Sequence, residues 1–414
     1  MRLGDTANVF LGRVVRVFIG TLGAQLIQIS SNVLLARLYS PSEMGIYSLW
    51  FGLLSVGGVV VTARYELAFF TVKHSAETHE IGKLVFMLAS VLSILLGLGF
   101  LATVTYTDLL PPSISPFIVA LVLGIFIFGL NNTLLSLLAF LRHFSMLGVS
   151  KITSAAAIAI VQVGAGILIY GASGLVYGHV IGSLLGLLLV LVLLDGTWKR
   201  GFRTATASQC KHVAKEYRSF PIYSLPADLL NNLARQLPIF IIVSRYGEDV
   251  GGWYGMTVKM MGAPVSLLAT SILEVFKEQA ARDYREKGNC RAIYVKTLPI
   301  LAVLALPPFL LLYMYSEFLF VLVFGEQWRE SGVYARFLVP MYYAAFVASP
   351  LSYVIYIAQK QRYDLAWQFG LLVVTALCFI LSRDPNIAII AFSWSYALMY
   401  LVYLLMSYHF SKGT

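Results

Sequence analysis

One apolar segment of this 414-residue chain carries four side chains that could bind an anion or exchange a cation: Asp228, Asn231, Asn232 and Arg235. A helix turns about 100° per residue, so this spacing places all four on one helix face. A guanidinium offers phosphate oxygens a planar fork of donors, and a carboxylate can titrate or bind a cation. Polar groups in hydrocarbon normally face protein or a water-filled cavity. The pattern therefore predicts a cavity-lining face.

A plainer interpretation remains open for the same face. Asp228 and Arg235 could neutralise each other, while the two asparagines join neighbouring helices. Their separation along the axis is about 10 Å, at about 1.5 Å of rise per residue, which is long for a direct pair.

A second polar stripe occurs near the start of the chain, where Thr21, Gln25, Gln28 and Asn32 share one helix face. The sequence Gly45-Ile-Tyr47 returns as Gly252-Trp-Tyr254, an offset of 207 residues or half of the 414 in the chain. The same offset takes Thr21 to Asp228 and Gln25 to Asn232. We therefore expect two parallel repeats whose polar stripes border one central cavity.

Four more charged residues fall inside apolar segments: Arg64, Glu66, Lys259 and Glu274. Lys259 lies deep in its segment and is a substrate-binding candidate. Arg64 and Glu66 lie toward one end of theirs, so they either face the cavity or extend to the membrane surface. Glu274 occupies nearly the matching place to Glu66 in the second half. With Asp228, the two glutamates are the candidates for coupling to an ion gradient. Arg336 is expected to be an interface anchor.

The elements that position these residues are transmembrane helices. Hydrophobic residues make up 59% of the chain and charged residues only 12%, whereas soluble domains carry about a quarter charged residues. Crossing a bilayer takes about 20 helical residues. We expect an all-α polytopic protein with about twelve spans, near residues 13–38, 44–70, 81–106, 115–140, 149–170, 174–194, 220–244, 250–275, 292–315, 332–358, 364–382 and 386–410.

The distribution of basic residues gives the orientation. Of the 30 Lys and Arg, 22 fall on the side of the N-terminus and four on the other side. This asymmetry predicts cytoplasmic termini and makes nucleic-acid binding improbable. Residues 1–195 are expected to form a first six-helix bundle, 196–219 a cytoplasmic linker and 220–414 a second bundle. Three distant cysteines predict no disulfide framework.

One motif carries a resemblance to a known family. The passage Asn32-Val-Leu-Leu-Ala-Arg-Leu-Tyr-Ser-Pro-Ser-Glu-Met-Gly-Ile-Tyr-Ser48, followed by Ala63-Arg-Tyr-Glu-Leu-Ala68, resembles the polysaccharide-transport branch of the multidrug/oligosaccharidyl-lipid/polysaccharide exporter superfamily, which includes the O-antigen flippases. The basic turns Leu141-Arg-His-Phe144 and Gln359-Lys-Gln-Arg-Tyr363 match the family more weakly. Motif similarity covers mainly residues 32–70. Only Arg64 and Glu66 carry over as family positions.

This resemblance implies two six-helix bundles around a central cationic cavity in a bacterial inner membrane. It implies that an undecaprenyl-diphosphate-linked oligosaccharide is flipped to the periplasmic leaflet, with antiport of protons or sodium and no bound cofactor. Membrane lipids, a polysaccharide polymerase and a chain-length regulator would be its partners. These expectations concern lipopolysaccharide and O-antigen biosynthesis, and the sequence does not identify the sugar or the ion.

Two other function classes fit the sequence less well. A drug exporter of the same superfamily would call for cavity carboxylates, whereas Arg64, Arg235 and Lys259 outnumber the mid-membrane acid Asp228. A membrane-embedded glycosyltransferase or polymerase usually needs a sizeable periplasmic loop, and the longest expected outer loop is about 316–331. The chain contains no recognisable nucleophile, phosphate-loop or metal motif. We therefore expect a transporter and no enzyme.

Overall fold

The computed structural model describes residues 3–72, 77–107, 110–168, 171–194 and 196–413. The side chains of residues 3–18, 197, 263, 266–268, 270–271 and 274 lie outside this description. Within the described ranges the regular elements are all helices, which confirms the expected all-α class. The chain forms two compact units, residues 1–236 and residues 237–414.

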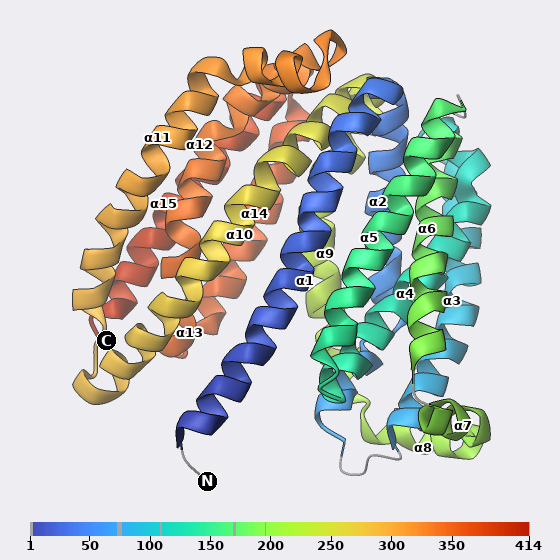
Figure 1. Cartoon of the computed structure of the whole chain (residues 1–414). Helices are drawn as coiled ribbons and strands as arrows, with labels where there is room; N and C mark the ends of the chain where they lie inside the picture. Colours follow the sequence, from blue (N-terminus) through green and yellow to red (C-terminus); the bar gives the residue numbers. More distant parts are fainter. Residues whose placement is uncertain (1–2, 73–76, 108–109, 169–170, 195, 414) are drawn as a thin grey trace. The chain divides into compact units, whose positions relative to one another are not determined.

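The first unit is built from six long helices and several short ones (Figure 1). The long helices are α1 (Leu3–Leu38), α2 (Pro41–Val61), α3 (Glu77–Tyr106), α4 (Ile118–Phe140), α5 (Phe144–Ile167) and α6 (Ala172–Leu193). The short ones are η1 (Tyr65–Phe70), η2 (Pro112–Phe117), α7 (Gly196–Thr204), α8 (Ala207–Glu216) and η3 (Phe220–Ser224). Helix α5 packs against α1 and α6, and α4 packs against α2 and α3. The beginning of α9 (Leu225–Tyr246) also belongs to this unit.

The motif that carries the family resemblance sets the start of α2. Ser40 is its N-cap, and Pro41 occupies the first turn, where a missing N–H is tolerated. The Ser40 hydroxyl accepts from the Glu43 N–H at 3.4 Å, and the Glu43 carboxylate accepts from the Ser40 N–H at 2.7 Å. This capping box satisfies donors that would otherwise be unpaired at the helix start.

The second unit contains the remainder of α9 and five further long helices (Figure 1). Its elements are α10 (Glu248–Lys287), α11 (Arg291–Phe324), η4 (Glu326–Trp328), α12 (Arg329–Leu351), α13 (Val354–Ile357), α14 (Gln361–Leu381) and α15 (Pro385–Ser411). Helix α12 packs against α10, α11 and α15 and so forms the centre of this unit.

Ten of the twelve expected spans are helices long and apolar enough to cross a membrane, counted over the described residues. The two others, α9 and α10, are helical at the expected places. Helix α9 falls short because its polar stripe lowers its hydropathy. The chain is therefore a polytopic membrane protein.

Two expected boundaries were wrong. The second span does not run to residue 70, because α2 ends at Val61 and a tight turn leads into η1. The expected outer loop at 316–331 is mostly helix, since α11 continues to Phe324 despite Pro299, Pro307 and Pro308. The actual connection between α11 and α12 is Gly325 with the short helix η4, which leaves still less room for an enzymatic loop.

The linker belongs with the first unit, so the division after residue 236 differs from the expected bundle boundary. Figure 1 shows α7 and α8 at one end of this unit, where both contact α3. The Tyr217 hydroxyl donates to Glu77 Oε2 at 2.6 Å, and the Lys83 ammonium donates to the Ala205 carbonyl. These contacts explain why the polar linker is ordered on a membrane bundle.

Candidate functional site

The turn after α2 has an unusual backbone that places Arg64. Ala63 (φ 46°) and Arg64 (φ 61°) are consecutive non-glycine residues in the left-handed region. Such conformations cost about 1–3 kcal/mol each and persist only where the surroundings hold them. The Arg64 N–H donates to the Thr62 hydroxyl at 3.2 Å, which is one such restraint. The strain indicates that the direction of the Arg64 side chain matters.

Arg64 is the centre of a three-residue ion cluster. Its Nη1 lies 3.0 Å from Glu66 Oε1, and its Nε lies 2.7 Å from Asp228 Oδ2 on α9. Glu66 is only 2% exposed, Arg64 22% and Asp228 39%, so the cluster runs from a buried to an accessible end. Oε2 of Glu66 is buried without a hydrogen-bond partner among the described residues. One guanidinium therefore forms ion pairs with two carboxylates. Arg64 and Glu66 are bound to each other and do not extend separately to the membrane surface.

The same α9 face makes further contacts with α2. Asn232 Oδ1 accepts from the Ser55 hydroxyl at 2.9 Å, and Gln236 Nε2 approaches that hydroxyl at 3.3 Å. Gln236, one turn beyond Asn232, was not among the predicted site residues. It could have been found by extending the polar stripe to position i+8 from Asp228.

Asn231 and Arg235 are exposed on α9. Asp228 pairs with Arg64 rather than with Arg235, so the internal neutralisation considered from the sequence was wrong. Within the described part of the chain, Arg235 has no carboxylate partner. An exposed guanidinium beside an exposed amide remains available to an anion.

The α1 stripe is not uniform in the structure. Thr21 accepts a hydrogen bond from Lys151 of α5 at 3.0 Å, and Asn32 is 2% exposed. Gln25 is half-buried and Gln28 is exposed. One part of the stripe thus packs against α5, and only Gln28 is fully accessible. That this stripe and the α9 stripe border one cavity stays a prediction.

The remaining predicted residues lie in the second unit. Lys259 has an exposed side chain on α10, whereas Glu274 lies on α10 outside the described side chains. Arg336, expected as an interface anchor, pairs with Glu317 of α11 at 2.9 Å. Arg336 is therefore part of an ion pair within the second unit.

A buried carboxylate, Asp364 on α14, was not predicted from the sequence. It is 6% exposed and accepts hydrogen bonds from the Tyr403 hydroxyl, from Tyr356 at 2.8 Å and from Gln368 at 2.8 Å. The polar pair Asp364 and Gln368 at spacing i, i+4 was the signal that could have identified it.

The second unit also has an apolar cavity of about 510 Å³ among α11, α12 and α15. Leu306, Phe309, Tyr343, Val347 and Trp394 are among its lining residues. Its walls suit hydrocarbon, and a volume of this size can hold part of a lipid chain.

The chemistry available at the Arg64 cluster is ionic. Two carboxylates share one guanidinium, so the cluster carries a net negative charge while both acids are ionised, and it could take up a cation at Asp228. Arg235, on the same helix face, could bind phosphate oxygens. No group of three or more His, Cys, Asp or Glu suited to a metal occurs among the described residues.

These features define the class of protein as a polytopic, all-α membrane protein with charged residues inside its helical units. A family model described as polysaccharide biosynthesis protein matches residues 34–333, and the chain belongs to this family. No curated protein matches the chain.

Solved structures show the same fold. The lipid II flippase MurJ in an inward closed conformation matches with a TM-score of 0.75 and 15% identity, over 95% of this chain and 87% of that one. An inward-facing multidrug resistance MATE family transporter of the MOP superfamily matches with a TM-score of 0.68 and 14% identity, over 95% and 97% of the two chains. A MOP superfamily transporter from Pyrococcus furiosus gives 0.54 and 15% identity, over 95% and 94%.

The chain therefore belongs to a family of polysaccharide biosynthesis proteins and has the fold seen in a lipid II flippase and in a MATE family transporter.

Proposed function

We propose that the protein moves an undecaprenyl-diphosphate-linked oligosaccharide from the cytoplasmic to the periplasmic leaflet of a bacterial inner membrane. Family membership supports a substrate used in polysaccharide synthesis. The observation that carries the proposal is the α9 face, where Asp228 is bound to Arg64 while Arg235 is exposed without a carboxylate partner among the described residues. Both termini and the linker lie in the cytoplasm in this proposal.

Arg235 is the principal contact for the diphosphate. A guanidinium can donate two parallel hydrogen bonds to phosphate oxygens, whereas an ammonium is a point charge. Asn231 and Gln28, which are exposed, and Gln25, which is half-buried, supply neutral donors and acceptors for sugar hydroxyls. Asn32 is buried and Asn232 is bound to Ser55, so these two hold the helix faces in place. Arg64 acts through its ion pair with Asp228 and does not contact the substrate directly. Lys259, whose side chain is exposed on α10, is a second candidate for phosphate binding.

Ion coupling uses Asp228 and Glu66. The substrate binds while Arg64 holds Asp228 and so fixes α9 beside η1. A proton or sodium ion on Asp228 replaces Arg64 and releases α9 from η1. The cation-bound and substrate-bound states then exclude each other, which is the condition for antiport. Because a ligand shifts an equilibrium only through its differential affinity, the Arg64–Asp228 pair must differ between the two states.

The test uses purified protein in liposomes and a labelled undecaprenyl-diphosphate oligosaccharide. We expect the lipid to change leaflet faster under an imposed proton or sodium gradient, with its mass unchanged. Cleaved or polymerised product would contradict the proposal and indicate an enzyme. Transport of cationic dyes without movement of the lipid would instead favour the multidrug alternative.

A further inference from the structure

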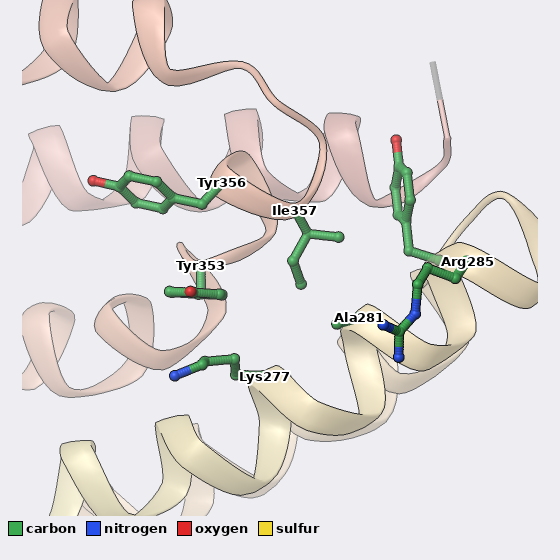
Figure 2. A pocket seen from close by; sticks show the side chains of 7 residues that line it. Lys277, Ala281, Arg285, Tyr353, Tyr356 and Ile357 are labelled. Carbon is green, nitrogen blue, oxygen red and sulfur yellow. The ribbon is translucent and has the colours of Figure 1, made fainter. Parts of the chain in front are cut away.

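A concave site of about 340 Å³ lies within the second unit (Figure 2). Helix α10 supplies Lys277, Ala281, Tyr284 and Arg285, and α13 with its N-cap residue supplies Tyr353, Tyr356 and Ile357. Its volume falls in the range of small-ligand pockets. The proposed transport mechanism uses none of these residues.

The pocket floor follows from the spacing on α10. Lys277, Ala281 and Arg285 are four residues apart, so they lie along one helix face about 12 Å in length. Figure 2 shows Ala281 between the two basic side chains. A methyl group at this position leaves space above the helix, with a positive charge at each end.

Two tyrosine rings form the opposite wall. The Lys277 ammonium lies 5.2 Å from the centroid of the Tyr353 ring, within cation–π range, and this contact helps to orient it. The Tyr353 and Tyr356 rings are 5.5 Å apart. The Tyr356 hydroxyl donates to Asp364 Oδ2 at 2.8 Å, so it presents its ring, not its hydroxyl, to the pocket.

Two carboxylates of this helix end, Glu278 and Asp283, are bound to other cations. Glu278 pairs with Arg282 at 2.5 Å, and Asp283 pairs with Lys287 at 2.9 Å. Over the residues that the structure describes, Arg285 has no carboxylate partner. Arg285 therefore contributes a positive charge to the pocket that no ion pair among the described residues neutralises.

The position of the pocket relative to the membrane indicates which kind of ligand can reach it. Helix α13 ends the candidate span Glu326–Ile357, and the next span begins at Gln361. The pocket thus lies where the chain turns at a membrane surface, the depth at which lipid head groups are found. Arginine, lysine and aromatic rings at that depth suit a phosphate whose lipid chain stays in the bilayer.

We infer that the Lys277–Arg285 pocket binds the phosphate group of a membrane lipid. Lys277 and Arg285 hold the phosphate oxygens above Ala281, and the Tyr353 ring keeps the ammonium in place. Phosphate could come from an anionic phospholipid or from a prenyl diphosphate, which share this chemistry. The site does not depend on the proposed transport reaction.

The experiment measures lipid binding to the full-length protein in nanodiscs of a zwitterionic lipid. Phosphatidylglycerol and undecaprenyl diphosphate are titrated separately, and bound lipid is counted by native mass spectrometry. We expect K277Q/R285Q to weaken binding of at least one lipid about tenfold or more, from the loss of charge-assisted hydrogen bonds. The matched control R282Q/K287Q removes two positive charges from the same helix end outside the pocket, and it should change binding less than about twofold.

Further variants test which side chains of the pocket bind the lipid phosphate. K277R/R285K keeps both charges and should retain more binding than K277Q/R285Q, which would assign the loss to the missing charges. Y353F should bind as the native protein does, whereas Y353L should weaken binding because the ring beneath Lys277 is lost. A loss for undecaprenyl diphosphate alone identifies a prenyl diphosphate site, and a loss for both lipids identifies a general phosphate site. Equal losses in the two glutamine double variants, or no loss in K277Q/R285Q, would overturn the inference, while flipping would remain separately testable.

Discussion

Arg64 Nε lies 2.7 Å from Asp228 Oδ2, and this ion pair joins the turn after α2 to the beginning of α9. The two residues are far apart in sequence and belong to the same compact unit. Asp228 reaches Arg64 because α9 is also bound to α2 through Asn232 and Ser55. The ion pair therefore forms only while the beginning of α9 is packed against the rest of the first unit.

Removing the Arg64 side chain should destabilise the first unit. Glu66 is 2% exposed, so R64A leaves a buried carboxylate without its cation, which costs about 3–5 kcal/mol. Thermal unfolding of the detergent-solubilised protein measures the loss. The double variant R64A/E66Q should recover part of the stability, because an amide needs no counter-charge. Equal stability of R64A and the native protein would show that the pair is not formed.

Asp228→Asn should separate binding from coupling. The variant keeps the size of the side chain but can neither hold a proton as an acid nor form the ion pair. The asparagine oxygen can still accept a hydrogen bond from Arg64 and so hold α9 in the substrate-binding position. We therefore expect membrane insertion and substrate binding to persist, while flipping no longer responds to a proton or sodium gradient. Asp249→Asn, at an exposed acid in the first turn of α10, is the control and should respond normally. A D228N protein with full gradient dependence would exclude Asp228 from coupling.

Arg235→Ala should abolish flipping without reducing the protein level. Arg235→Lys should restore only part of the activity, because a point charge replaces the planar fork of donors. The flipping assay with labelled lipid-linked oligosaccharide measures both. Arg245→Ala serves as the control, since Arg245 lies in the last turn of the same helix. Normal transport by R235A would contradict the assigned role.

Cysteine labelling can test the orientation of the linker. Ser208 is exposed on α8, so S208C should react with an impermeant maleimide only from the cytoplasmic side. The native thiols should interfere little. Burial raises the pKa of Cys210, and burial is also the main reason that the pKa of Cys290 rises to about 11. The thiolate is the reactive form, and at pH 8 a pKa of about 11 leaves about one thousandth of Cys290 ionised.

A raised thiol pKa lowers the fraction of thiolate, and with it the rate of labelling, until the pH approaches that pKa. Labelling of native Cys290 should therefore be slow at pH 7–8 and increase at higher pH. The control is the chain with Cys210, Cys290 and Cys378 replaced by alanine. Labelling of S208C from the periplasm of intact cells would reverse the proposed topology.

The Asp364 network should contribute to the stability of the second unit. Asp364→Asn places an amide NH₂ among three donors, from Tyr403, Tyr356 and Gln368. At least one buried hydrogen bond is lost, and we expect a cost of about 1–3 kcal/mol in the free energy of unfolding. Thermal unfolding checks this value. Asp384→Asn is a matched control, because asparagine also caps helices and the α15 N-cap should survive.

Apolar runs and the spacing of polar residues in the sequence are enough to predict the positions of the helices and the polar face of α9. The length and hydropathy of the segment predict helix α9, and the 3.6-residue period predicts its polar stripe, since both are local properties of a helix in a membrane. The start of α2 follows from Ser40, Pro41 and Glu43, whose capping interactions involve only near neighbours in the chain.

Which partner each charged residue binds follows only from the tertiary structure. Asp228 could have met Arg235 or Arg64, and helical periodicity cannot choose between a residue on its own helix and one on another element. The left-handed turn at Ala63 and Arg64, which directs the guanidinium, has no glycine to mark it in the sequence. The burial of Asp364 likewise depends on Tyr403, a residue on a different helix. A periodic pattern shows which face of a helix is polar, but the packing of the helices determines which charges meet there.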